Sequence, residues 1–276
     1  MVMADAARAK EYLRFIGYYR LSGYLASLVD PADANRERFI AGTSFDGALE
    51  LYIFDRKLRV LLLDALERIE IAAKAAISNE GSLSKGPFWL CDPANFDHGA
   101  HDEIMETLRD AVRVDEPRQQ HLFISNFFSK YNNPMPPSWM VMEVLSFGVV
   151  SKIYKCTKGE LQTKVGQSFG INRTLLISWL HALAFARNVC AHNGQVWDRL
   201  FTITPKIPNK YKGDWPEASQ DRLYILCCVI HEMMGVVSGG SGWSNRLRDL
   251  IAERGCAPLS AMGFPTDWEQ KAFWKF

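Results

Sequence analysis

The residues best suited to chemistry stand in one hexapeptide, Arg187-Asn188-Val189-Cys190-Ala191-His192. At about 3.6 residues per helical turn, Asn188 and His192 share one face, and Arg187 can reach the same substrate through its long side chain. Histidine titrates near neutral pH, which suits His192 to move the proton of a ribose 2′-hydroxyl or of the leaving 5′-oxygen. Arginine can hold two phosphate oxygens and offset the charge that develops on phosphorus. The spacing predicts metal-free chemistry on a phosphodiester, with Asn188 aligning the site.

The same hexapeptide also has a structural interpretation. Asn193-Gly194 is a typical helix end, so His192 would interact with the last helical carbonyls and Arg187 would form an ordinary salt bridge. Because six-residue patterns arise often by chance, the hexapeptide alone favours this structural interpretation. Its sequence context has to decide between the two.

Composition sets broad bounds. The chain has 276 residues, 48% hydrophobic and 23% charged, with a formal net charge of +1. One large domain or two tightly joined ones would fit, and an RNA partner would have to be met by a local basic patch. Six cysteines without a CxxC pair favour reduced thiols over disulfides or a zinc site. No apolar signal core begins the chain, and apolar runs such as 144–150 are too short to span a bilayer. These features predict a soluble cytoplasmic protein without membrane contact.

Helical periodicity dominates the chain and predicts an all-α fold. We expect a first helical stretch over 7–28, broken at Gly17 and Gly23, and a long helix over 49–79 with a start signal at Ser44. The charged residues of the long helix, including Asp55, Arg59 and Glu70, are interpreted as a solvated or helix-pairing face. Further helices are expected over 102–114, 118–131, 137–153, 158–169, from 172 to the Asn193-Gly194 end, 217–237 and 243–254.

A resemblance extends well beyond the hexapeptide. It rests on GYYRLSGY (17–24), SF (44–45), LYIFDRKLRVLLLDALERIEIAAKAAI (51–77), PPSWMVMEVLSFG (136–148) and SWLHALAFARNVCAHNGQVWDR (178–199). In this order, the segments resemble the Abi-like family of bacterial abortive-infection proteins, of the AbiD and AbiF type. Such proteins are similar to the HEPN superfamily, whose helical-bundle members share an Arg-x-x-x-x-His motif. Arg187 and His192 match that motif, and Asn188 matches its common Arg-Asn beginning.

The resemblance implies a metal-independent endoribonuclease that needs no cofactor and acts in phage defence or a toxin-antitoxin system. Arg187, Asn188 and His192 would be its catalytic residues, and an antitoxin or a structured non-coding RNA would be a further partner. The chain contains no second Arg-x-x-x-x-His, so a site with two motifs requires a homodimer. We expect one Abi-like helical domain over 1–276, with a HEPN-like core over 45–80 and 137–240 and added N-terminal, middle and C-terminal helices. Residues 85–136 would form a helical insertion or subdomain.

Two alternatives to catalysis stay open. The same helices could hold RNA or an antitoxin without cleaving, or the chain could be a structural dimerisation protein. Candidate RNA contacts follow the motif, with aromatic rings to stack on bases and cations to hold phosphates: Trp197, Arg199, Lys206, Lys210 and Lys212. A solvated loop with buried aromatic residues is an equal interpretation of this stretch.

Other motifs favour structural interpretations. Gly166-Gln167-Ser168-Phe169-Gly170 matches the GxSxG elbow of hydrolases, but a helical stretch precedes it where that motif needs a strand. His98, His101 and His121 with Cys91 lack a closed four-ligand pattern, and His231-Glu232 lacks the second histidine of a zinc protease. We therefore expect no metal site.

Overall fold

The computed structural model describes residues 3, 5–35, 37–97, 99–116, 118 and 120–274. These residues form eleven α-helices joined by loops and short 3₁₀ turns. Within these ranges, strand-like pairing is limited to isolated bridges, such as that between Val29 and Phe39. The predicted all-α fold is confirmed.

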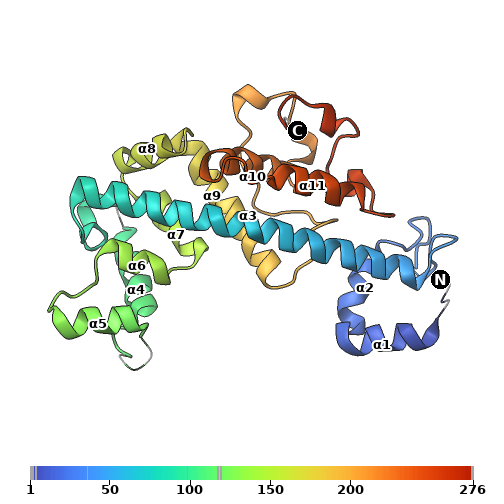
Figure 1. Ribbon diagram of the computed structural model, residues 1–276, viewed down its shortest axis with the longest axis horizontal. Helices are drawn as coiled ribbons and strands as arrows, with labels where there is room; N and C mark the ends of the chain where they lie inside the picture. Colours follow the sequence, from blue (N-terminus) through green and yellow to red (C-terminus); the bar gives the residue numbers. More distant parts are fainter. Residues whose placement is uncertain are drawn as a thin grey trace.

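Helix α3 (Phe45–Lys85) is the long axis around which the other helices lie (Figure 1). Its 41 residues begin at the predicted signal, where Ser44 Oγ accepts a hydrogen bond from Gly47 N–H at 3.1 Å. The helix ends at Gly86, whose φ of 89° is a conformation that glycine adopts without strain. The helix is therefore longer at both ends than the predicted range of 49–79.

Helix α2 (Tyr18–Ala26) packs on the N-terminal part of α3, and α1 (Ala6–Ile16) packs on α2 and reaches the start of α3 through the ion pair of Arg8 with Asp46. Gly17 separates them with a φ of 85°, as predicted. The second predicted break, at Gly23, is wrong, because Gly23 lies inside α2. A Cβ there would come within 3.2 Å of Gln195 Oε1, so this glycine permits a close approach between α2 and the segment after the motif.

A single helix predicted over 137–153 is two helices, α6 (Ser138–Val144) and α7 (Phe147–Cys156). The break falls at Leu145, which is extended with ψ at 143°. Ser146 then begins α7, because its Oγ accepts from Val149 N–H at 3.4 Å. Apolar periodicity continues through this turn, so periodicity alone could not locate the break.

The remaining helices are α4 (His101–Val112), α5 (Leu122–Lys130), α8 (Gly159–Ser168), α9 (Arg173–Ala191), α10 (Leu223–Val237) and α11 (Trp243–Ala252). The motif helix α9 packs against α3, α7, α8 and α10. Helix α10 begins later than predicted, because residues 217–219 form a separate 3₁₀ turn.

One large apolar core joins most of these helices. It includes residues of the middle region, such as Trp89 and Leu108, together with α3 and α9. The division into a core and an insertion over 85–136 stays a prediction. Of the helices in the described ranges, α9 alone is long and apolar enough to cross a membrane, but half of its apolar window is buried inside the protein. A core helix has the same composition.

Candidate active site at the end of α9

Helix α9 ends within the hexapeptide. Asn172 begins the helix by accepting from Thr174 N–H at 2.8 Å, and Ala191 is its last residue. Asn193 then adopts a left-handed conformation with φ at 57°, and Gly194 N–H donates back to the Val189 carbonyl at 2.8 Å. This is the helix end predicted from Asn193-Gly194. It places His192 at the boundary position directly after the last helical turn.

The imidazole of His192 is exposed and unengaged. Its backbone N–H donates to the Asn188 carbonyl at 3.0 Å, but no hydrogen bond or ion pair holds its ring within the described ranges. Asn188 is also exposed, and its amide makes no hydrogen bond to another described residue. A histidine that served only as a helix cap would bond the last carbonyls. The exposed ring of His192 makes no such bond with a residue that the structure describes.

Arg187 lies half-buried between α9 and α3. Its Nε is 3.4 Å from Glu70 Oε2, and the other oxygen of Glu70 forms an ion pair with Lys74 Nζ at 3.1 Å. The salt bridge of the structural interpretation therefore exists. The contact is at Nε, and neither terminal nitrogen of Arg187 makes a hydrogen bond to a residue that the structure describes. The guanidinium is thus oriented by a buried carboxylate while its two outer nitrogens can still bind a phosphate.

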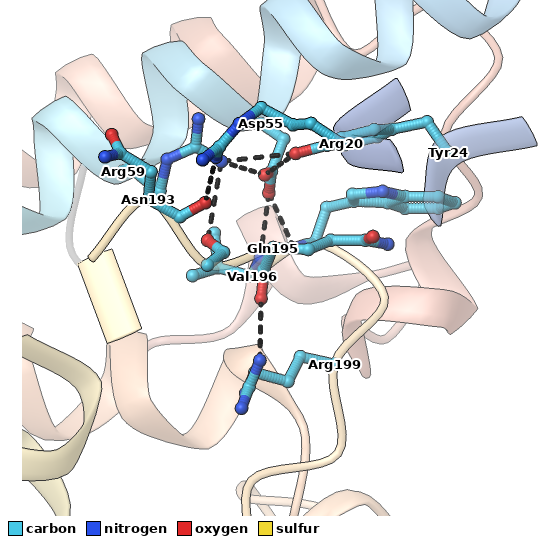
Figure 2. Close-up of polar contacts among 10 residues, drawn as sticks. Arg20, Tyr24, Asp55, Arg59, Asn193, Gln195, Val196 and Arg199 are labelled. Atoms are coloured by element: carbon cyan, nitrogen blue, oxygen red, sulfur yellow. Dashed lines mark hydrogen bonds and ion pairs between the residues drawn. The ribbon is translucent and has the colours of Figure 1, made fainter. Parts of the chain in front are cut away.

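The segment after the motif is held by a buried aspartate, Asp55 of α3 (Figure 2). Its Oδ1 accepts from the backbone N–H groups of Val196 and Trp197 at 3.0 and 2.9 Å. Its Oδ2 accepts from the Tyr24 hydroxyl at 2.6 Å and from the Arg59 guanidinium. One carboxylate therefore ties α2, α3 and the chain beyond α9 together.

Two arginines bind the carbonyls at the helix end. Arg59 donates to the Gly194 carbonyl at 3.4 Å, and Arg20 of α2 donates to the Asn193 carbonyl at 2.9 Å (Figure 2). Positive groups are favoured there, because the last carbonyls of a helix carry partial negative charge. These contacts fix the backbone immediately after His192, so they position its imidazole indirectly.

Burial changes the titration of this network. Burial raises the pKa of Asp55, although its bonds from Tyr24, the two backbone N–H groups and Arg59 oppose the shift. Burial and the neighbouring Asp55 carboxyl also raise the pKa of Tyr24, so its hydroxyl stays a donor. Within the hexapeptide, burial raises the pKa of the Cys190 thiol to about 12, which makes this cysteine a packing residue and not a nucleophile.

The positions of Asp55, Arg59 and Glu70 correct a sequence-based interpretation. All three were expected on a solvated or helix-pairing face; the solvated alternative is wrong, because Asp55 is fully buried and the other two are at least nine-tenths buried, where α3 contacts α2 and α9. Asp55 stands four residues after Leu51 and three before Leu58, both of which are buried. This apolar phase was the signal for its burial. Other charges of α3, namely Arg56, Lys57 and Glu67, are exposed as expected.

Three of the five segments on which the family resemblance rests meet here. Tyr24 belongs to GYYRLSGY, Asp55 to the long helical segment, and Val196 to the segment around the motif. A family model described as Abi-like protein matches residues 11–198, about two thirds of the chain. The chain belongs to this family. No curated protein and no solved structure matched the chain.

The predicted RNA contacts of this Abi-like protein have different environments. Trp197 is 2% exposed, so it packs in the core and presents no open face for stacking. Lys210 forms an ion pair with Glu232 at 2.6 Å. Arg199 is half-buried, with its guanidinium 5.9 Å from the centre of the Phe185 ring. Lys206 and Lys212 are exposed. The five residues therefore do not form one surface.

The rival motifs have structural roles in the Abi-like fold. Helix α8 covers most of Gly166–Gly170, and Gly170 follows its end with φ at 64°, so the expected helix terminus is confirmed. His231 packs between the rings of Phe273 and Trp274, with centroids 5.0 and 4.9 Å away. Among the described residues, no three histidine, cysteine or acidic side chains come together as metal ligands, and His98 lies outside those residues.

Proposed function

We propose that this Abi-like protein is a metal-independent endoribonuclease of the HEPN superfamily, of AbiD or AbiF type. It would act in bacterial phage defence or a toxin-antitoxin system. One observation carries the proposal: the exposed imidazole of His192 makes no polar contact with a described residue, and it lies on the same helix end as Arg187, whose terminal nitrogens make no hydrogen bond within that part of the chain. Family membership supports a role related to abortive infection, and the chemistry of these side chains supports RNA as the substrate.

The proposed reaction uses the 2′-hydroxyl of the RNA as nucleophile. His192 removes the 2′-proton or protonates the leaving oxygen, while the 2′-oxygen bonds to phosphorus and the bond from phosphorus to the 5′-oxygen breaks. Arg187 binds the phosphate oxygens and offsets their developing charge, and Asn188 aligns the phosphate. Glu70 is a positioning residue that holds Arg187 through Nε. The products are a 2′,3′-cyclic phosphate and a 5′-hydroxyl.

A homodimer would complete the site with a second motif. Support comes from Val60 and Ile71, two apolar residues of α3 that are 60% and 58% exposed. They stand eleven residues apart, about three helical turns, and so share one face. Each follows in sequence a residue that contacts the motif region, Arg59 and Glu70 respectively, although its side chain points about 100° away around the helix. An isologous contact over this face would bring two motifs toward one another.

The test is cleavage of single-stranded RNA by the purified protein in EDTA, with analysis of the product ends. Arg187→Ala and His192→Ala should each slow cleavage by at least about a hundredfold, the usual contribution of an acid-base or charge-stabilising group. His121→Ala is the matched control, because His121 is an exposed histidine at the start of α5. Variants that cleave as fast as the parent, or products without a cyclic phosphate, would contradict the proposal.

The main competing function is a non-catalytic module that binds RNA or an antitoxin. RNA binding without cleavage, in EDTA and in magnesium alike, would favour that module and overturn the proposed enzyme. A structural dimerisation protein would be indicated if RNA neither binds nor raises the melting temperature, because a ligand that prefers the folded state must stabilise it.

A further inference from the structure

A groove between α7 and α9 opens beside the motif. Its volume is about 410 Å³, within the range of pockets that hold small ligands. Helix α7 lines it with Ser151, Lys152 and Lys155, and α9 lines it with His181, Phe185 and Asn188. On each helix these positions repeat at three- and four-residue spacing, so two helical faces form opposite walls. Ile203, from the chain after the motif, also lines the groove.

The groove has the charge of an anion site. None of the described residues that line it is acidic. Lys155 is exposed in the last turn of α7 and makes no ion pair with any residue that the structure describes, and the exposed His181 likewise lacks a polar partner among them. Lys152 forms an ion pair with Glu103. Because the side chains of that pair are 43% and 68% exposed, water and salt weaken it, and a phosphate can compete for Lys152.

Phe185 adds an aromatic surface to the groove. It is half-buried, and its ring meets that of Phe201 edge-on at 6.4 Å between centroids. The Arg199 guanidinium lies 5.9 Å from the Phe185 centroid, and its Nε is buried without a hydrogen bond to another described residue. An aromatic ring held between lysines and an arginine is the arrangement that binds single-stranded nucleic acid, in which bases stack and phosphates pair.

Asn188 connects the groove to the motif, because it lines the groove and stands one turn before His192. We propose that the groove binds an unpaired nucleotide of RNA adjacent to the scissile phosphate. Lys152 and Lys155 contact its phosphate, and Phe185 stacks on its base. The inference rests on the proposed function for its ligand class. It adds a binding subsite, and with it a preference for single-stranded RNA.

Binding is tested separately from cleavage in the His192→Ala protein, by fluorescence anisotropy with a labelled single-stranded RNA of about 12 nucleotides. Adding Lys155→Glu should raise Kd at least about tenfold. The slope of log Kd against log salt concentration should become smaller by about 0.7 for each phosphate contact that is lost. Lys130→Glu is the matched control, because Lys130 is an exposed lysine in the last turn of α5 that forms no ion pair with the described residues. It should leave Kd within about twofold.

Phe185→Leu tests the stacking contact while keeping an apolar side chain in the wall. It should raise Kd at least about fivefold, since one stacked base contributes roughly 1–3 kcal/mol. Unchanged circular dichroism and melting temperature would show that the fold is intact. If Lys155→Glu and Phe185→Leu both bind RNA as Lys130→Glu does, the groove is not the subsite, even if the parent cleaves RNA.

Two further outcomes separate the inference from the proposed enzyme. If the parent protein binds RNA through Lys155 and Phe185 but does not cleave it, the binding subsite in the groove is supported and the proposed catalytic function is contradicted. Polyglutamate could displace the labelled RNA as well as unlabelled RNA does, while Phe185→Leu has no effect. That result would indicate that the ligand is an acidic protein segment and would overturn the assignment of a nucleotide.

Discussion

At the scale of single residues, Asp55 controls how the motif is presented. Its carboxylate is fully buried and accepts bonds from Tyr24, Arg59 and two backbone N–H groups beyond α9. Buried ion pairs seldom add net stability over apolar packing, because both charges lose their hydration. A more specific benefit here is that the carboxylate fixes the backbone that follows His192.

Asp55→Asn should lower the free energy of unfolding by about 1–3 kcal/mol, because the new amide nitrogen cannot accept a hydrogen bond and leaves a buried donor unsatisfied. Urea denaturation measures this. Asp64→Asn is the control, because Asp64 pairs with Arg68 and Arg246 near the surface and should contribute no more than about 1 kcal/mol. If the two substitutions lower the free energy of unfolding equally, the buried bonds of Asp55 contribute no more to stability than the surface ion pairs of Asp64.

Stability should also depend on pH through Asp55. Since burial raises its folded pKa, the folded protein keeps this proton to higher pH than the unfolded chain. The stabilisation from the raised pKa of Asp55 is fully present below the ordinary aspartate pKa of about 3.9. It is lost as the pH rises through the pKa of Asp55 in the folded protein. The difference in free energy of unfolding between the parent and Asp55→Asn should therefore fall as the pH rises across this window. A difference that grows with pH would contradict the assignment.

Other carboxyl groups act in the opposite direction, so this comparison needs the Asp55→Asn reference. Although partial burial opposes the shift, bonds from Arg246 and Arg68 hold the pKa of Asp64 below its usual range. Its contribution is present above the unfolded pKa and is lost as the pH falls through the folded one. Subtracting the variant's curve from the parent's cancels such terms.

At the scale of elements, α3 connects the two ends of the molecule. Its N-terminal half carries Asp55 and Arg59, and its middle carries Glu70 opposite Arg187. Near its C-terminal end, Gly81 lies in the helix interior, where glycine is usually unfavourable. A Cβ at this position would lie 2.3 Å from the Trp89 ring, so the glycine is required for the buried indole to pack on the helix.

Gly81→Ala should therefore destabilise the protein by about 1–3 kcal/mol, the usual effect of overpacking a core. Gly235→Ala is the control, because nothing lies within 4 Å of a Cβ at this exposed position in α10. Alanine there should be neutral or stabilise by up to about 1 kcal/mol, since it is the better helix former. Thermal unfolding of both variants checks the pair, and a stabilising Gly81→Ala would refute the packing account.

At the scale of the whole molecule, the chain carries one Arg-x-x-x-x-His motif, and two exposed apolar residues, Val60 and Ile71, lie on the helix that contacts the motif region. Val60→Glu and Ile71→Glu should weaken a homodimer more than about tenfold, because each would bury an unpaired charge at the contact. Light scattering reports the mass, and RNA cleavage should fall with dimer content. Leu83→Glu is the control, because Leu83 is an 84% exposed residue near the far end of the same helix. A monomer that cleaves RNA would contradict an active site composed of two motifs.

Local chemistry was legible in the sequence. Ser44 and Asn172 begin helices because their side chains satisfy free N–H groups one turn ahead, and Gly17 interrupts a helix because its φ is positive. Asn193-Gly194 ends α9 for the same kind of reason. Each of these contacts lies within a few residues of its partner, so the sequence by itself determined the all-α class and the place of His192 at a helix end.

Only the tertiary structure decided which polar residues are buried and what faces the motif. Asp55 bonds to Val196 across 141 positions of the chain, and Arg187 meets Glu70 from another helix. Periodicity describes one helix at a time, whereas the solvation of a side chain depends on the segment that packs over it. The groove between α7 and α9 is decided in the same way, because each helix supplies one wall and the pairing of the walls is set by the core beneath them.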